Sequence, residues 1–184
     1  MTPYIILIAG ISGSGKTTYA RYLAKKLHVP FIGKDNIKEK LHDVIQYDTE
    51  QQGNSQLYGA ASYSVFFHIA ECLMKADISF VLESNFNLAS ADILLPIVEK
   101  CNYRALTILF DADMEVLYKR IIEREATDER HPGLKIPSNS NINYFNPDIY
   151  KNFCVGEKIM IDTTDFTKVD FEGHIVSARL FMGE

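Results

Sequence analysis

The fold of this chain is decided by one stretch, Gly10-Ile-Ser-Gly-Ser-Gly-Lys16-Thr17, which matches the pattern G-x-x-x-x-G-K-[ST] of a phosphate-binding loop. The continuous apolar run at 4–9 precedes the loop and is typical of a strand in a parallel sheet that is covered on both faces. The segment 16–27 follows the loop and predicts a helix, because its apolar residues recur at helical spacing. A glycine-rich turn that merely precedes a helix is the alternative, and the strand and helix on either side disfavour it.

The loop predicts a nucleoside triphosphate as its ligand. Glycine has no side chain, so the backbone can curl around an anion and turn successive N–H groups toward it, while the helix N-terminus adds a positive dipole. Lys16 is expected to contact the β- and γ-phosphates, and the Thr17 hydroxyl is expected to bind Mg²⁺. The residues of this stretch that are expected to bind the nucleotide are Gly10, Ser12, Gly13, Ser14, Gly15, Lys16, Thr17 and Thr18.

Length and composition indicate a single domain, 1–184, that needs no disulfide framework. The 3 cysteines are scattered and form no C-x-x-C pair, so we expect reduced thiols and a cytoplasmic protein. The net charge of −5 at pH 7 disfavours a nucleic-acid backbone as the partner. Residues 1–9 run directly into the loop, so no signal peptide is expected, and no apolar stretch is long enough to predict a membrane span. The oligomeric state is left open.

Helical and strand patterns alternate along the chain, which is typical of an α/β fold with a parallel sheet and right-handed crossovers. Further strands are predicted at 31–32, 78–82, 106–110 and 158–161, and further helices at 36–45, 58–76, 91–100, 114–125 and 170–181. At the start of the helix 36–45, we expect Asn36 and Glu39 to form a capping pair. The apolar residues of that helix are expected to face inward; they are Leu41, Val44 and Ile45.

Polar side chains follow the predicted strands, and in open parallel sheets ligands bind beyond the carboxyl ends of the strands. Asp35 follows the second strand and is either the general base that accepts a proton from an attacking hydroxyl or a helix N-cap. Glu83 ends the third strand and is expected to support Mg²⁺, with a base or a substrate contact as its alternatives. Asp111 and the turn at 162–164 follow the last two strands, and Asp111 has a plain turn role as its alternative.

Residues 126–157 have little apolar periodicity, so we predict a lid and a substrate-facing segment there. Arg120 and Arg124 lie one helical turn apart before this segment, and Arg130 lies within it. Planar guanidinium groups suit bidentate phosphate binding and stacking on adenine. The three arginines are therefore expected to contact phosphate or adenine, and the alternative is a solvated helix face paired with Glu115, Glu123 or Glu125.

The chain resembles the small P-loop kinases of the adenylate-kinase-like group, particularly the AAA_33-type ATP-binding kinases related to zeta-toxin and polynucleotide-kinase domains. The resemblance rests on GISGSGKT at 10–17, KDNIKEKL at 34–41, VLESNF at 81–86, YKRIIER followed by RHPG from 118 to 133, and MIDTTDF at 160–166. It implies a three-layer sandwich whose five-stranded parallel sheet has the order 2-3-1-4-5, with a lid. Glu83 departs from the aspartate that is usual in the group, and the segment 134–156 matches no pattern with a known substrate.

The resemblance also implies roles for several residues. Asp35 falls where related kinases place the carboxylate that contacts the acceptor hydroxyl, and Arg120 and Arg124 fall at adenine-stacking and phosphate-binding positions. Thr164 falls in a turn near the adenine base.

The function expected from the sequence is that of a Mg-ATP-dependent kinase acting on a small-molecule hydroxyl or phosphate acceptor, with Lys16, Asp35, Arg124 and Arg130 as catalytic residues. The first alternative is an ATP-binding regulatory or ATPase module without an acceptor. The second is a nucleic-acid 5′-hydroxyl kinase, which the negative charge of the chain disfavours.

Overall fold

A five-stranded parallel sheet with the order β2-β3-β1-β4-β5 forms the centre of the computed structural model, which describes residues 2–48, 51, 53–127, 130–135 and 148–183. The strands are β1 (Tyr4–Gly10), β2 (Phe31–Gly33), β3 (Phe80–Glu83), β4 (Arg104–Asp111) and β5 (Glu157–Asp162). The predicted fold class and strand order are therefore confirmed.

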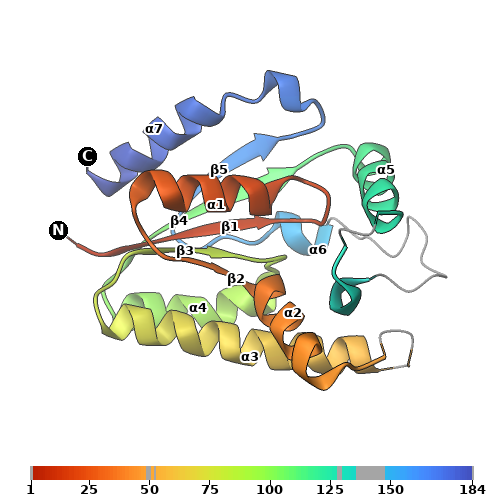
Figure 1. Ribbon diagram of the computed structural model, residues 1–184. Coiled ribbons are helices and arrows are strands. Elements are labelled where there is room, and N and C mark those ends of the chain that lie inside the picture. The colour runs from red at the N-terminus through yellow and green to blue at the C-terminus, as the bar shows by residue number, and fades with distance from the viewer. Residues whose placement is uncertain (1, 49–50, 52, 128–129, 136–147, 184) are drawn as a thin grey trace.

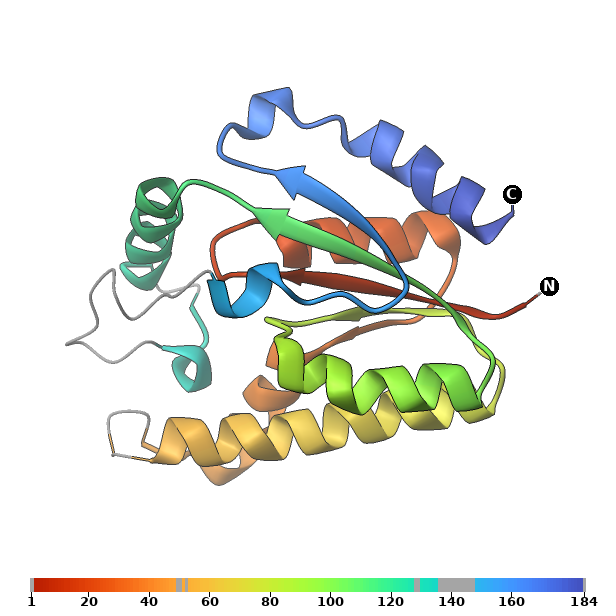
Figure 2. The ribbon, with the colours of Figure 1, turned by 180° about the vertical axis from the view of Figure 1, so that it is seen from behind.

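Helices cover both faces of the sheet, so the molecule has three layers (Figures 1 and 2). The helices are α1 (Lys16–Leu27), α2 (Lys34–Ile45), α3 (Asn54–Lys75), α4 (Leu88–Lys100), α5 (Met114–Glu125), α6 (Asp148–Lys151) and α7 (Phe171–Met182), with the short 3₁₀ turns η1 (Pro132–Leu134) and η3 (Phe166–Lys168). Helices α1 and α7 lie on one face, and α3 and α4 lie on the other (Figure 1). Within the described part of the chain, no helix has the length and apolar character needed to cross a membrane.

The central strand β1 supplies side chains to both halves of the core. Because side chains alternate along a strand, Ile5 and Leu7 pack against α3 and α4, whereas Ile6 and Ile8 pack against α1 and α7. All four side chains are fully buried. The continuous apolar run of β1 thus reflects a strand that is covered on both sides.

Glycine is required where β1 turns into the phosphate loop. Gly10 has a φ of +138°, and a Cβ atom there would lie 2.3 Å from the backbone oxygen of Phe110 in β4. The close approach of two neighbouring strands therefore fixes the position where the loop begins.

The start and the inner face of α2 differ from the sequence prediction. The helix begins at Lys34, directly after β2, with Gly33 as its N-cap and no side-chain capping bond, so the predicted capping pair of Asn36 and Glu39 is wrong. Val44 is 84% exposed, so the predicted inward-facing apolar stripe is also wrong at this end of the helix. The apolar pattern predicted the wrong inner face because the buried residue of this helix is a lysine, Lys38.

Part of the predicted lid segment 126–157 belongs to the core. Phe153 and Val155 are fully buried beneath the sheet, and the Thr107 hydroxyl of β4 exchanges hydrogen bonds with the backbone of Val155 at 2.9 Å. The part of the predicted lid at 136–147 lies outside the described residues.

Phe66→Ala should lower the free energy of unfolding by about 3–5 kcal/mol, because it removes a fully buried ring that contacts Tyr63, Phe67 and Phe86. Urea denaturation followed by circular dichroism measures the change. Val65→Ala is the matched control, since Val65 is the preceding residue of α3 and is 42% exposed. Equal losses in the two variants would contradict this description of the core.

Candidate active site

The carboxyl ends of three neighbouring strands bring the predicted site residues together. Ile8 of β1 is in register with Glu83 of β3, and Glu83 is in register with Gly33 of β2. Since β1 continues into the phosphate loop and β2 continues into α2, Glu83 lies between the loop and the first turn of α2. That turn contains Asp35.

The phosphate loop has the backbone shape that an anion site needs. Gly13 and Gly15 have φ angles of +83° and +81°, which glycine adopts without strain. Gly15 is the N-cap of α1 and makes no side-chain capping bond, so it leaves the first amides of α1 without a side-chain acceptor at this position. The Ser14 hydroxyl donates to the backbone oxygen of Ile11 at 2.8 Å and holds the loop in this shape. The predicted ligands Ser12 and Thr18 lie on the same loop and helix start.

A buried pair of opposite charges lies beneath the loop. The Lys16 ammonium is 3.7 Å from Oε1 of Glu83 and donates to the backbone oxygen of Ile11 at 3.3 Å. Both residues are almost fully buried. Burial lowers the pKa of Lys16, while Glu83 and Asp35 oppose that shift. Burial raises the pKa of Glu83, and Lys16 opposes it.

Thr17 and Glu83 form a donor set that fits Mg²⁺. The Thr17 hydroxyl is close enough to the Glu83 carboxylate to favour its ionised form and to lower its pKa, against the effect of burial. A hydroxyl and a carboxylate both offer hard oxygen atoms, which Mg²⁺ prefers, and Mg²⁺ keeps most of its remaining positions for water and phosphate oxygens.

Asp35 is held in its ionised form by the cations around it. Its Oδ1 atom is 2.5 Å from the Lys34 ammonium. Burial acts to raise the pKa of Asp35, but Lys34, Lys16 and Arg130 outweigh it and lower the pKa to about 2. The N-cap alternative for Asp35 is wrong, because Gly33 occupies the N-cap and Asp35 lies in the first turn.

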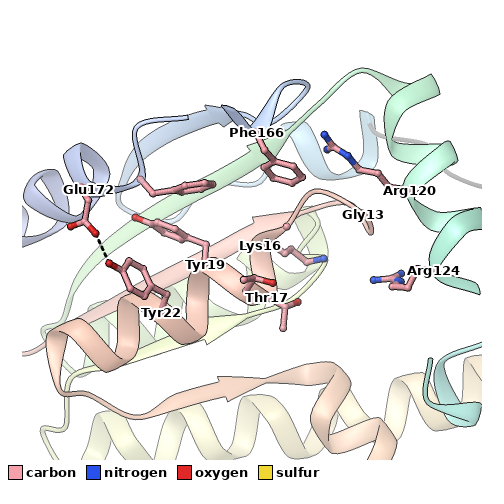
Figure 3. Close-up of a pocket in the computed structure, with 12 residues that line it drawn as sticks. Gly13, Lys16, Thr17, Tyr19, Tyr22, Arg120, Arg124, Phe166 and Glu172 are labelled. Carbon is pink, nitrogen blue, oxygen red and sulfur yellow. Dashed lines mark hydrogen bonds between the residues drawn. The ribbon is translucent and has the colours of Figure 1, made fainter. Parts of the chain in front are cut away.

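The two arginines of α5 point into the site (Figure 3). The Arg120 guanidinium lies over the ring of Phe166, 4.1 Å from its centre, and donates to the backbone oxygen of Thr164 at 3.1 Å. Nε and one terminal nitrogen of Arg124 are buried without a hydrogen-bond partner among the described residues. Burial, followed by Arg130, lowers the pKa of Arg124. Figure 3 shows the Arg124 side chain directed toward Lys16 and Thr17.

Arg130 is fixed at the start of the segment that follows α5. It forms an ion pair of 2.9 Å with Glu125, in which both side chains are largely buried, and it donates to the backbone oxygen of Leu134 at 2.8 Å. This segment is attached to α2, since Oδ1 of Asp43 lies 2.9 Å from Nε2 of His131. The predicted pairing of an arginine with Glu125 is thus present for Arg130, in a buried rather than a solvated setting.

A cavity of about 700 Å³ extends from the phosphate loop between α1, α5, η3 and the start of α7. It is lined by Gly13, Gly15, Lys16, Thr17, Thr18, Tyr19, Tyr22, Arg120, Arg124, Phe166, Phe171 and Glu172. The Tyr22 hydroxyl and the Glu172 carboxylate form a hydrogen bond across one end of the cavity (Figure 3).

Sequence reasoning missed the aromatic wall of this cavity. Phe166 lies two residues after Thr164 and could have been found from its place in the MIDTTDF motif. Phe171 and Glu172 open α7 and belong to no motif, so only the packing of α7 beside α1 places them here. Asp111 has its own partner, Lys151, at 3.6 Å.

Known proteins resemble the whole chain or large parts of it. A candidate kinase from Chloroflexus aurantiacus has a structure that covers 98% of this chain and 99% of its own, with 25% identity and a TM-score of 0.87. The APS kinase of Mycobacterium tuberculosis, solved with AMPPNP and APS, shares the fold at 15% identity, with a TM-score of 0.64 and coverage of 100% of this chain and 99% of its own.

In sequence, a shikimate kinase of Bacteroides fragilis is 26% identical over 117 residues, which span 63% of this chain and 60% of that enzyme. A family profile described as an AAA domain, AAA_33, matches residues 5–135. The resemblance drawn from the sequence motifs is confirmed: this chain belongs to the AAA_33 family and has the fold of the P-loop kinases.

Proposed function

We propose that this protein is a kinase that transfers the γ-phosphoryl group of Mg-ATP to a hydroxyl group of a small molecule. The observation that carries the proposal is the Asp35 carboxylate, which forms an ion pair with Lys34 in the first turn of α2, at the same edge of the sheet as the Lys16–Glu83 pair. A module that only binds ATP would not need a further carboxylate beside the phosphate-binding residues. The kinases among the related proteins support the same reaction class.

The positive groups of the site suit the charge that develops on the transferred group. Phosphoryl transfer passes through a loose transition state, so catalysis comes mainly from positioning and charge stabilisation. Lys16 and the loop amides would bind the β- and γ-phosphates, and Arg124 offers unpartnered donors toward the same place. Thr17 and Glu83 would hold Mg²⁺, which neutralises phosphate charge when bound.

Asp35 would orient the acceptor hydroxyl and take up its proton. A carboxylate with a pKa of about 2 is a weak base, but it is ionised throughout the neutral range and always accepts a hydrogen bond. In a loose transition state the hydroxyl loses its proton late, so orientation matters more than base strength. Glu83, whose pKa is raised by burial, is the alternative base.

An ADP-release screen tests the proposal directly. Nucleosides, sugars, amino alcohols and 5′-hydroxyl oligonucleotides are offered with Mg-ATP, and a small molecule is expected to stimulate ADP formation. Stimulation by the oligonucleotides alone would favour a nucleic-acid kinase, and binding of ATP with no stimulation by any acceptor would favour a regulatory module.

Lys16→Met should lower turnover with the best acceptor by about 10²-fold or more, because it removes a charged donor from the transferring phosphate. The methionine fills most of the same buried volume, and the melting temperature verifies that the variant folds. Lys25→Met is the control, since Lys25 is exposed on the same helix. Wild-type turnover in Lys16→Met would contradict the role of the phosphate loop.

Asp35→Asn should lower kcat by about 10²- to 10⁴-fold and leave the KM for ATP nearly unchanged, because the amide keeps the shape but loses the negative charge that orients the hydroxyl and takes up its proton. Steady-state kinetics with both substrates measure the two constants, and Glu39→Gln on the same helix serves as the control. Full activity in Asp35→Asn would move the base assignment to Glu83.

Arg124→Ala should lower kcat by a larger factor than it raises the KM for ATP, since a group that stabilises the transferring phosphoryl acts most strongly in the transition state. The same kinetics on Lys119→Ala, a 77% exposed side chain of α5, provide the comparison. An effect confined to the KM for ATP would mean that Arg124 binds ATP equally well in the ground state and in the transition state, which would contradict the prediction.

A further inference from the structure

Lys38 is a buried lysine without a carboxylate partner. It lies on α2 one helical turn after Asp35, and its 8% exposure makes it the buried residue of that helix. Its ammonium donates to the Ser55 hydroxyl of α3 at 3.0 Å. Across the ranges that the structure describes, no carboxylate lies within ion-pair distance, 4.0 Å, of this ammonium. A buried charge without an opposite charge is unfavourable, so the fold keeps this lysine at a cost.

The charges near Lys38 add to that cost. Burial and then Lys34 and Arg130 lower its pKa to about 8, and only Asp35 acts in the opposite direction. Lys34 itself has Asp35 as its ion-pair partner and the ring of Tyr63 beneath its ammonium at 5.3 Å. Lys38 therefore carries the positive charge that is left unbalanced on this side of the site.

This charge is separate from the cations that serve ATP. Lys16, Arg120 and Arg124 line the nucleotide cavity, whereas Lys38 lies outside the set of residues that line it. Lys38 projects instead between α2 and α3, which lie side by side in both views (Figures 1 and 2). Asp35 lies in the first turn of α2, directly after β2, whose last residue, Gly33, is in register with Glu83. Lys38 lies one turn further along the helix, so its charge is farther from the end of β2 than Asp35 is.

We propose that Lys38 binds an anionic group of the acceptor, a phosphate or a carboxylate. The inference rests on the proposed kinase function and narrows the acceptor to a small alcohol that carries its own anion. Side chains three residues apart on a helix have Cβ atoms about 5–6 Å apart, so the hydroxyl at Asp35 and the anion at Lys38 belong to one compact molecule. The acceptor oxygen bonds to the γ-phosphorus as the bond to the bridging oxygen of ADP breaks, and the hydroxyl proton passes to Asp35.

Matched acceptor pairs test the proposal. Glucose is compared with glucose 6-phosphate and gluconate, and nucleosides are compared with their 5′-monophosphates, in the ADP-release assay. The anionic member of each pair is expected to be the better acceptor. Comparing glucose 6-phosphate with gluconate shows whether the site prefers a phosphate or a carboxylate. A neutral member that is used as well as its anionic partners would overturn the proposal.

Lys38→Met should raise the KM for the anionic acceptor by about 10- to 100-fold, because it removes a charged hydrogen bond while keeping the apolar stem. The KM for ATP should stay unchanged, and Lys38→Arg should restore part of the acceptor affinity. Lys40→Met is the control, since Lys40 is on the same helix with its side chain 80% exposed. If Lys38 only links α2 to α3 through Ser55, Lys38→Met would lower the melting temperature and leave the KM for the acceptor unchanged. That result would contradict the assignment.

A binding measurement separates this inference from the proposed function. Inorganic phosphate is titrated calorimetrically into protein whose phosphate loop is filled with Mg²⁺ and a non-hydrolysable ATP analogue. Wild type and Lys40→Met should bind phosphate, and Lys38→Met should lose at least about 10-fold in affinity. Equal affinity in Lys38→Met, or no binding to wild type, would overturn the anion site even in an active kinase. Lys38-dependent binding without turnover of any acceptor would support the anion site and refute the kinase.

Discussion

The buried pair of Lys16 and Glu83 is the interaction on which the rest of the site depends. Each charge would be costly at the sheet edge alone, because it has been taken out of water, so each requires the other. The pair links the start of α1 to the end of β3, and β3 in turn holds β2 in register. The position of α2, and with it Asp35, follows from this link. One ionic contact thus connects the phosphate loop to the side of the site where Asp35 lies.

Positive charge exceeds negative charge around this pair. The positive side chains are Lys16, Lys34, Lys38, Arg124 and Arg130, and the negative ones are Asp35, Glu83 and Glu125. Bound anions therefore complete the electrostatics of the site rather than disturb them. An anion that binds only the folded state would also stabilise it by mass action.

The sequence predicted the parts of the fold that local patterns control. The phosphate loop, the alternation of strands and helices and the sheet order all followed from motif, periodicity and resemblance, because β1 is buried on both faces and the loop requires glycine at fixed positions. The start of α2 could not be predicted, since Gly33 caps it without any side-chain signal. Phe171 and Lys38 were missed because only tertiary packing brings Phe171 to the wall of the cavity and buries the side chain of Lys38. The roles assigned to the site residues remain predictions.

Because η1 is attached to α2, the two sides of the site are built from different elements of the fold. Gly133 packs so closely on His42 that a Cβ atom there would lie 2.5 Å from the histidine Cβ, and the Tyr47 hydroxyl donates to the Gly133 oxygen at 3.0 Å. The proposed acceptor side is thus built from α2, α3 and the turn fixed on them, while the cavity beside the phosphate loop is lined by α1, α5, η3 and α7. If the proposed function holds, substitutions on α2 and α3 would change the choice of acceptor without altering the residues that line the cavity beside the phosphate loop.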